Sequence, residues 1–254
     1  MKDYLIDTHA HIDMIEEPIT TILSEMLELS VKKVIIPSVE EKTMDKVLDL
    51  AEKNNNIYAM IGIYPTEAKT YSQEIEDKML LRAKSSKVVA VGEIGLDYYW
   101  DKSFCDLQKE IFAKQIKLAN SLNLPIVVHD REAHKDTFDV LKGFNKGSKV
   151  LFHCFSGSVE FMRECVREGW YIALGGVVTF KNAVKMKEVA LEVPLDKLVL
   201  ETDSPYLTPV PYRGKTNKPA YVRYVAEEIA KIRNMQVEEL IDITTRNAEE
   251  FFNI

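Results

Sequence analysis

The sequence predicts a (β/α)₈ barrel, because strand-like apolar runs recur along the chain and helical segments separate them. The runs begin about 25 to 35 residues apart, which is the spacing expected of repeated βα units. Most are rich in Val and Ile without polar alternation, as expected of parallel strands that are covered on both faces. About eight such runs in 254 residues match one barrel, so we expect residues 1–254 to form a single domain.

The predicted strands can be read off the chain in order. They are YLID (4–7), KVIIPSV (33–39), IYAMIGI (57–63), VVAVGEIG (88–95), PIVVHD (125–130), KVLFHCF (149–155), YIALGGVV (171–178) and KLVLETD (197–203). The clearest helical segment is 103–123, where apolar residues roughly follow one helical stripe. The longest irregular stretch, 204–219, follows the last strand, where a barrel places an active-site loop.

A doubly wound open sheet is the alternative fold for this alternation of strands and helices. Such sheets often carry a nucleotide-binding fingerprint after a strand. The sequence has no GxGxxG after the first strand and no GxxxxGK[ST] anywhere. The barrel therefore remains the preferred prediction.

Composition indicates a soluble globular protein, with 46% hydrophobic and 29% charged residues. We expect a cytoplasmic protein, because no apolar run reaches the roughly 18 residues of a membrane span and the first residues do not resemble a signal peptide. The three cysteines are widely spaced, which argues against a disulfide framework. The net charge of −7 argues against a protein that coats nucleic acid but leaves room for a local anion site. The sequence indicates no membrane contact and no obligate protein partner.

The stretch IDTHAHID (6–13) places two histidines two residues apart behind the first apolar run. In an extended strand Asp7, His9 and His11 would point to one side, because side chains alternate between the two faces. Two imidazoles on one rigid strand suit a divalent metal ion. The alternative is a strand end with two exposed or hydrogen-bonded histidines.

Further metal-binding residue types follow the same pattern at the carboxyl ends of the predicted strands, the face where barrel enzymes keep their chemistry. The set comprises His9 and His11 on the first strand, Glu93 on the fourth, His129 on the fifth, His153 on the sixth and Asp203 on the eighth. These six residues are more than one tetrahedral ion needs. A carboxylate such as Glu93 can bridge two ions about 3.5 Å apart, so we expect a binuclear centre that activates water.

At this point the sequence resembles the TatD-family metal-dependent hydrolases, which are similar to the wider amidohydrolase group. The resemblance covers nearly the whole chain, and its motifs are DTHAHID at the start, GEIGLDYYW (92–100), LPIVVHDREAHKD (124–136), HCFSG (153–157), LETDSPYL (200–207) and RNAEEFFNI (246–254). It implies a (β/α)₈ barrel that hydrolyses DNA ends as a 3′ to 5′ exonuclease, with RNA ends as the alternative substrate. The implied cofactors are two divalent ions, magnesium, manganese or zinc.

The resemblance also implies a role for each matching residue. His9, His11 and Asp203 would hold the first ion, Glu93 would bridge, and His129 and His153 would hold the second. Asp203 and Glu93 are the predicted catalytic residues, and Arg131 would contact a substrate phosphate. The chain departs from the family at GIYPT, where many relatives read GIHPH, so Tyr64 and Thr66 replace histidines near the mouth of the third strand.

Several further residues are candidates for supporting roles. Asp7 and Glu201 should face the barrel interior, either orienting a ligand histidine or forming a structural ion pair. Arg213, Lys215 and Lys218 form, with Arg131, either an anion site or an ordinary solvated loop. The aromatic run Tyr98, Tyr99 and Trp100 either stacks on nucleic-acid bases or covers the barrel rim.

Three functions fit this pattern. The leading one is a metal-dependent phosphodiesterase acting on nucleic-acid ends. The second is an amidohydrolase-type deacylase or esterase, because two metal ions can activate water against a small carbonyl substrate as well. The third, a barrel that binds without catalysis, predicts a broken ligand set, and all six predicted ligands are present.

Overall fold

The structure, a computed structural model, describes residues 2–254. They form two compact units, one containing the residues up to Ile36 together with Gly157–Ile254, the other Pro37–Ser156. Each unit carries parallel strands that alternate along the chain with helices. Within the described residues, no helix has the length and hydropathy needed to cross a membrane.

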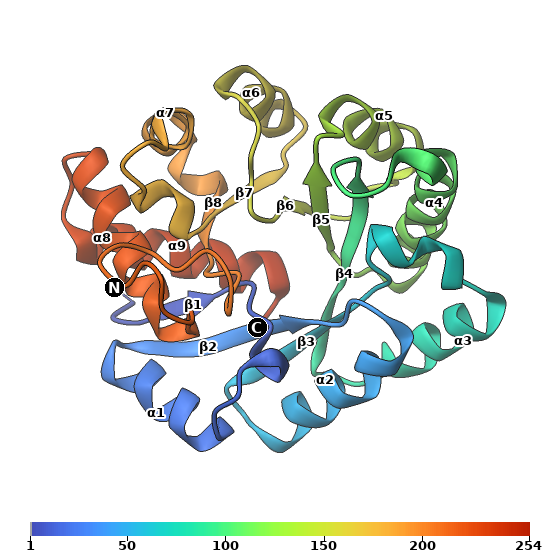
Figure 1. Ribbon diagram of the computed structural model, residues 1–254, viewed down its shortest axis with the longest axis horizontal. Coiled ribbons are helices and arrows are strands. Elements are labelled where there is room, and N and C mark those ends of the chain that lie inside the picture. The colour runs from blue at the N-terminus through green and yellow to red at the C-terminus, as the bar shows by residue number, and fades with distance from the viewer. Residues whose placement is uncertain (1) are drawn as a thin grey trace. The chain divides into compact units, whose positions relative to one another are not determined.

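The first unit places strands from both ends of the chain side by side. Its strands are β1 (Leu5–Asp7), β2 (Val31–Pro37), β7 (Tyr171–Leu174) and β8 (Leu198–Leu200). β1 pairs with β2 and β7 pairs with β8, and the N–H of Thr8 donates to the carbonyl of Leu200 over 3.1 Å, which joins the end of β1 to β8. Its helices are α1 (Ile19–Glu28), α6 (Val159–Arg167), α7 (Val184–Glu192), α8 (Val222–Ile232) and α9 (Val237–Phe252). The C-terminal helix α9 packs against β1, β8 and α8 (Figure 1).

The second unit is built from four strands in chain order. They are β3 (Ile57–Ile61), β4 (Val88–Asp97), β5 (Ile126–Arg131) and β6 (Val150–Phe152), each paired in parallel with the next. The helices are α2 (Glu41–Lys53), α3 (Gln73–Arg82), α4 (Cys105–Leu122) and α5 (His134–Phe144). α4 packs on β4 and on α5, and the two helices lie side by side in green (Figure 1).

All eight predicted strands are present, but their ends differ from the apolar runs. β6, β7 and β8 have 3, 4 and 3 residues, because the chain leaves the regular ladder before each apolar run ends. β4 instead continues two residues past the predicted end, to Asp97. All ten residues of β4 are buried, as expected of a parallel strand with both faces covered.

Gly95 allows β4 and β5 to approach each other beside a predicted metal ligand. Its φ of +148° lies where L side chains are strained, and a Cβ added there would lie 2.0 Å from the carbonyl oxygen of His129. Gly95 is also the register partner of His129. The absence of a side chain at position 95 therefore allows the main chain of His129 to lie this close to β4.

We expect Gly95→Ala to lower the free energy of unfolding by about 3 kcal/mol or more, because the methyl group collides with main chain that cannot rotate away. Urea denaturation followed by circular dichroism measures the change. The matched control is Gly143→Ala in α5, where an added Cβ meets nothing within 4 Å. Alanine at position 143 should leave stability unchanged or raise it by up to about 1 kcal/mol. Equal stability of the two variants would contradict the close approach at Gly95.

Candidate active site

The first cluster of predicted ligands lies in the first unit and consists of His9, His11 and Asp203. β1 ends at Asp7, so the two histidines lie just beyond the regular strand, after the predicted apolar run 4–7. Main-chain hydrogen bonds hold this segment: the N–H of Asp203 donates to the carbonyl of His9 over 2.9 Å, and the N–H of His11 donates to the carbonyl of Ser204 over 2.7 Å. The chain after β1 and the chain after β8 thus run together and present their side chains to one another.

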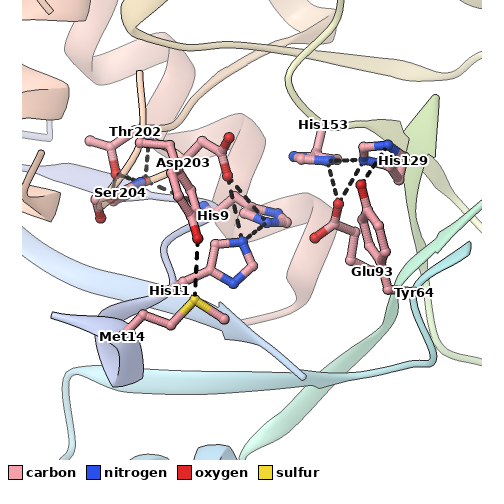
Figure 2. Close-up of polar contacts among 12 residues, drawn as sticks. His9, His11, Met14, Tyr64, Glu93, His129, His153, Thr202, Asp203 and Ser204 are labelled. Atoms are coloured by element: carbon pink, nitrogen blue, oxygen red, sulfur yellow. Dashed lines mark hydrogen bonds and ion pairs between the residues drawn. The ribbon is translucent and has the colours of Figure 1, made fainter. Parts of the chain in front are cut away.

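The side chains of this first cluster converge, as Figure 2 shows. The Nε2 atoms of His9 and His11 are 3.3 Å apart. The Oδ1 atom of Asp203 is 3.5 Å from Nε2 of His11 and 3.9 Å from Nε2 of His9. The side chain of His9 is fully buried, whereas that of Asp203 is 16% exposed. Asp203 has a φ of +56°, a left-handed conformation that Asp tolerates better than most residues.

The second cluster lies in the second unit and consists of Glu93, His129 and His153. Glu93 was expected at the carboxyl end of its strand. It lies instead within β4, which continues to Asp97. His129 lies within β5, and His153 follows β6, where its N–H donates to the carbonyl of Val128 over 3.0 Å. Two neighbouring strands, β4 and β5, and the residue directly after β6 therefore each supply one of these side chains.

The three donor atoms of the second cluster form a small triangle. Oε1 of Glu93 is 2.8 Å from Nδ1 of His129 and 2.8 Å from Nε2 of His153, and the two nitrogens are 3.2 Å apart (Figure 2). Glu93 and His153 are buried, and the side chain of His129 is 13% exposed. One carboxylate oxygen thus lies between two imidazole nitrogens.

Both clusters have the donor chemistry of a divalent metal site. Neutral imidazole and carboxylate are ordinary ligands of zinc and manganese, and carboxylate of magnesium. Ligand atoms around a tetrahedral ion with bonds of 2.0 to 2.1 Å lie about 3.4 Å from one another. The separations of 2.8 to 3.2 Å in the second cluster are somewhat shorter than this, and those of 3.3 to 3.9 Å in the first are close to it. Only small adjustments would be needed, so the residues fit such ions.

The outer nitrogen of His129 is held by two residues that sequence reasoning did not select as partners. Its Nε2 lies 3.1 Å from Oδ2 of Asp97 and 2.9 Å from the hydroxyl of Tyr64, and that hydroxyl donates to the same Asp97 oxygen over 3.2 Å. Asp97 is fully buried. The signal that could have found it is its position in GEIGLDYYW, four residues after Glu93 on a strand that was expected to end at Gly95.

The charges around His129 shift two pKa values. Burial alone would lower the pKa of His129, but hydrogen bonds and charge interactions with Asp97 and Glu93 raise it to about 9. Burial would raise the pKa of Asp97, but His129 and the main-chain N–H groups of Tyr99 and Trp100 lower it below its usual value. An ion held by His129 would therefore compete with a proton for the ring.

The two predicted supporting carboxylates lie beside the first cluster. Asp7 accepts hydrogen bonds from the N–H groups of His9 and Thr202, over 3.3 and 2.9 Å, and its other oxygen lies 2.6 Å from the Thr202 hydroxyl. Burial raises the pKa of Asp7 to about 8 against the effect of these bonds. Asp7 therefore positions His9 through the main chain. Glu201 is fully buried, with a carboxylate oxygen within 4.8 Å of a ring nitrogen of His9.

Arg131 and the aromatic run after β4 meet at the surface of the second unit. The guanidinium carbon of Arg131 is 3.8 Å from the ring centroid of Tyr99 and 5.5 Å from that of Trp100. Tyr99 is 49% exposed and Trp100 is 68% exposed. Tyr98 instead donates from its hydroxyl to Asp136 over 2.8 Å. The predicted phosphate contact and the predicted stacking residues thus form one exposed cationic and aromatic patch.

The loop after β8 contains cations of two kinds. Lys218 pairs with Glu17 at 2.9 Å and with Glu25 at 2.8 Å, so its charge is compensated within the first unit. Arg213 and Lys215 are exposed, with the guanidinium of Arg213 lying 4.0 Å from the ring centroid of Phe180. These two side chains retain the positive charge that an anion site needs.

One buried amide holds this loop near Asp203. The side chain of Asn217 donates to the carbonyl of Thr202 over 2.9 Å and to that of Tyr206. Asn217 is fully buried, so losing these bonds would leave two carbonyl groups without that donor. The residues on either side of Asp203 are fixed by this contact, which sequence reasoning did not find.

The model of the family described as TatD related DNase matches residues 6–253. The chain belongs to the TatD family of metal-dependent hydrolases. It is 44% identical to YabD of Bacillus subtilis over 98% of this chain and 99% of that protein, and 36% identical to YcfH of Escherichia coli over 99% and 96%. Both of these TatD-family relatives are named as metal-dependent hydrolases.

Solved structures confirm the predicted fold class. The structure of YjjV, a TatD homologue from Escherichia coli, superimposes with a TM-score of 0.92 at 31% identity over 98% of both chains. An organophosphorus hydrolase from Deinococcus radiodurans, at 12% identity and a TM-score of 0.65, shares the fold. The strands follow one another in the sheet in the order β1 to β8. The chain is thus a (β/α)₈ barrel metal-dependent hydrolase of the TatD family.

Proposed function

We propose that the protein is a phosphodiesterase that removes nucleotides from DNA ends in the 3′ to 5′ direction, with RNA ends as the alternative substrate. Residues 1–254 act as one catalytic domain in the cytoplasm. Its two ligand clusters hold the two ions of a binuclear centre, with Glu93 as the bridging carboxylate. The family-model description, TatD related DNase, supports a nucleic-acid substrate.

The observation that carries this proposal is the position of Arg131. It follows His129 by two residues on β5, and its guanidinium lies against the exposed ring of Tyr99. A guanidinium can bind a phosphate through two parallel hydrogen bonds, and exposed aromatic rings can stack on unpaired bases. A site with both features beside its metal ligands suits a nucleic-acid end.

Each residue has a distinct task in this proposal. Bound divalent ions would supply Lewis acidity that activates water and stabilises charge on the leaving oxygen. Asp203 accepts the proton that the attacking water loses, because its carboxylate is the partly exposed member of the first cluster. Arg131 orients the scissile phosphate, and Arg213 and Lys215 attract the strand. Asp7 and Glu201 support the first cluster.

The alternative is an amidohydrolase-type deacylase or esterase that acts on a small carbonyl substrate, since the same ions serve both reactions. We propose to test both functions with purified, metal-loaded protein. The assays are nucleotide release from single-stranded and duplex oligonucleotides labelled at either end, and hydrolysis of a panel of esters and amides, each with magnesium, manganese or zinc. Stepwise release from 3′ ends that stops in a strong chelator is expected. Intact oligonucleotides beside rapid ester or amide hydrolysis would favour the alternative.

Asp203→Asn should reduce the rate about a hundredfold or more while leaving the fold and most metal binding intact. Asparagine keeps the shape and one ligand oxygen but cannot take up the proton. His129→Ala should differ, because it removes a ligand of the second cluster, and high metal concentration should restore part of its activity. A metal titration of both variants provides the comparison. Recovery of Asp203→Asn to the same extent as His129→Ala would show that Asp203 is a ligand and not the proton acceptor.

Arg131→Ala should weaken activity on phosphodiesters much more than on any small ester, because a phosphate offers the guanidinium a charge-assisted bidentate partner. The loss should appear mainly in KM if the contact already exists in the substrate complex. Steady-state kinetics on both substrate types measure the effect. A matched control is Arg163→Ala. Arg163 and its partner Glu192 both belong to the first unit, whereas Arg131 belongs to the second. Equal losses on both substrate types for Arg131→Ala would assign Arg131 a structural role.

A further inference from the structure

We propose that Asp97 is a positioning residue that couples metal binding to substrate binding: one of its carboxylate oxygens orients the His129 ring and the other fixes the turn that carries Tyr99 and Trp100. The inference rests on the proposed function, because it treats His129 as a metal ligand and the aromatic turn as a substrate surface. All the residues involved belong to the second unit.

The first oxygen, Oδ2, acts on His129. It lies 3.1 Å from Nε2 of the ring, while Nδ1 on the opposite side faces Glu93 at 2.8 Å. A carboxylate at Nε2 requires a proton on that nitrogen, which leaves Nδ1 available to an ion. The Tyr64 hydroxyl donates to the same oxygen over 3.2 Å and lies 2.9 Å from Nε2, so it holds both partners in place.

The second oxygen, Oδ1, acts on the chain that follows β4. It accepts the N–H of Tyr99 over 2.9 Å and the N–H of Trp100 over 3.3 Å, an arrangement in which an Asp side chain closes a turn. The two aromatic side chains leave this turn at the surface, where Arg131 lies over the Tyr99 ring. The position of the exposed aromatic rings therefore depends on the same carboxylate that orients His129.

The main chain of Asp97 is fixed independently. Its N–H donates to Oε1 of Gln108 over 2.9 Å, and Nε2 of Gln108 donates back to its carbonyl over 3.0 Å. Gln108 lies on α4 and is 1% exposed. With its main chain held on both sides, Asp97 presents its two oxygens in fixed directions. The orientation of the His129 ring and the position of the turn therefore depend on the same side chain.

Asparagine at position 97 has the same shape but cannot serve both sides. If its oxygen faces the turn, its amide N–H₂ faces Nε2 of His129, and Nε2 must accept that hydrogen bond. The ring proton then moves to Nδ1, the nitrogen at which an ion would bind. If its oxygen faces His129, the amide N–H₂ opposes the N–H groups of Tyr99 and Trp100. Either orientation loses one of the two functions while the volume of the side chain is unchanged.

The experiment compares Asp97→Asn and Tyr64→Phe with wild type, using zinc alone and no substrate. Chelator competition measures zinc affinity at both sites. A change in tryptophan emission reports the turn, because Trp100 is 68% exposed there, whereas the other tryptophan, Trp170, is 5% exposed and belongs to the first unit. The matched control is Asp130→Asn, which removes a carboxylate next to His129 in sequence that instead contacts His134 at 2.6 Å. Thermal unfolding of each variant shows whether the fold is kept.

We expect Asp97→Asn to weaken one of the two zinc affinities about 10- to 100-fold and to leave the other, and the emission of Trp100, close to wild type. A changed emission with intact zinc affinity would also support the coupling, because it corresponds to the other orientation of the amide. Tyr64→Phe keeps the carboxylate, so its zinc affinity should fall about three- to tenfold.

The proposal is overturned if Asp97→Asn folds, keeps the wild-type emission and loses no more zinc affinity than Asp130→Asn. If Asp97→Asn does not fold, Tyr64→Phe decides, and an unchanged zinc affinity in that variant would overturn the proposal. Absence of nuclease activity in the wild type would contradict the proposed function but would leave the zinc measurements and their interpretation intact.

Discussion

Main-chain pairing between neighbouring parallel segments is the constraint on which the candidate site depends. His153 follows a strand of three residues, yet its N–H continues the ladder to Val128 on β5. The N–H of Asp203 continues the pairing beyond β8 to the carbonyl of His9. These bonds fix the main chain of His153, Asp203 and His9 independently of the side-chain contacts. A site assembled in this way is organised in advance, so binding an ion requires little rearrangement of the protein.

The buried carboxylates beside the ligands show that the balance between burial and partners decides the direction of each pKa shift. Asp7 and Asp97 are both fully buried. Asp7 faces a hydroxyl and N–H groups, and burial prevails and raises its pKa to about 8. Asp97 faces an imidazole that can carry a proton as well as two N–H groups, and these lower its pKa. Asp97 can therefore keep its charge beside His129 and orient the imidazole ring. Asp7 instead accepts hydrogen bonds from the main chain of His9 and Thr202.

The sequence was sufficient for the fold and for the identity of the side chains that converge within each cluster. Apolar runs locate buried strands, and residues placed after them reach the same edge of a parallel sheet. It was not sufficient for strand ends, because these depend on which N–H groups find partners. Gly95 looked like the end of a strand, yet it is the residue that lets β4 continue beside β5, and Asp97 was missed for that reason.

The pairing of the cations in the loop after β8 could not be predicted from the sequence either. The sequence alone does not show which of the three cations in this loop is paired with a carboxylate. Only the tertiary contacts distinguish Lys218 from Arg213 and Lys215. Lys218 meets Glu17 and Glu25 from a segment about 200 residues away. Such pairing is invisible in local pattern, because a lysine in a polar loop looks the same whether it is paired or solvated.

If the proposed nucleic-acid substrate is correct, the acidic total charge and the local cationic patch together restrict how that substrate binds. A protein with a net charge of −7 repels a long polyanion that lies along its surface, and the repulsion grows with the number of phosphates in contact. Arg131 with Tyr99 and Trp100 forms a small local patch rather than a long cationic track. Attraction limited to a few phosphates, set against repulsion of the rest, favours binding of a strand terminus over binding within a strand. The electrostatics that argue against a nucleic-acid coat protein are therefore compatible with the proposed action on strand ends.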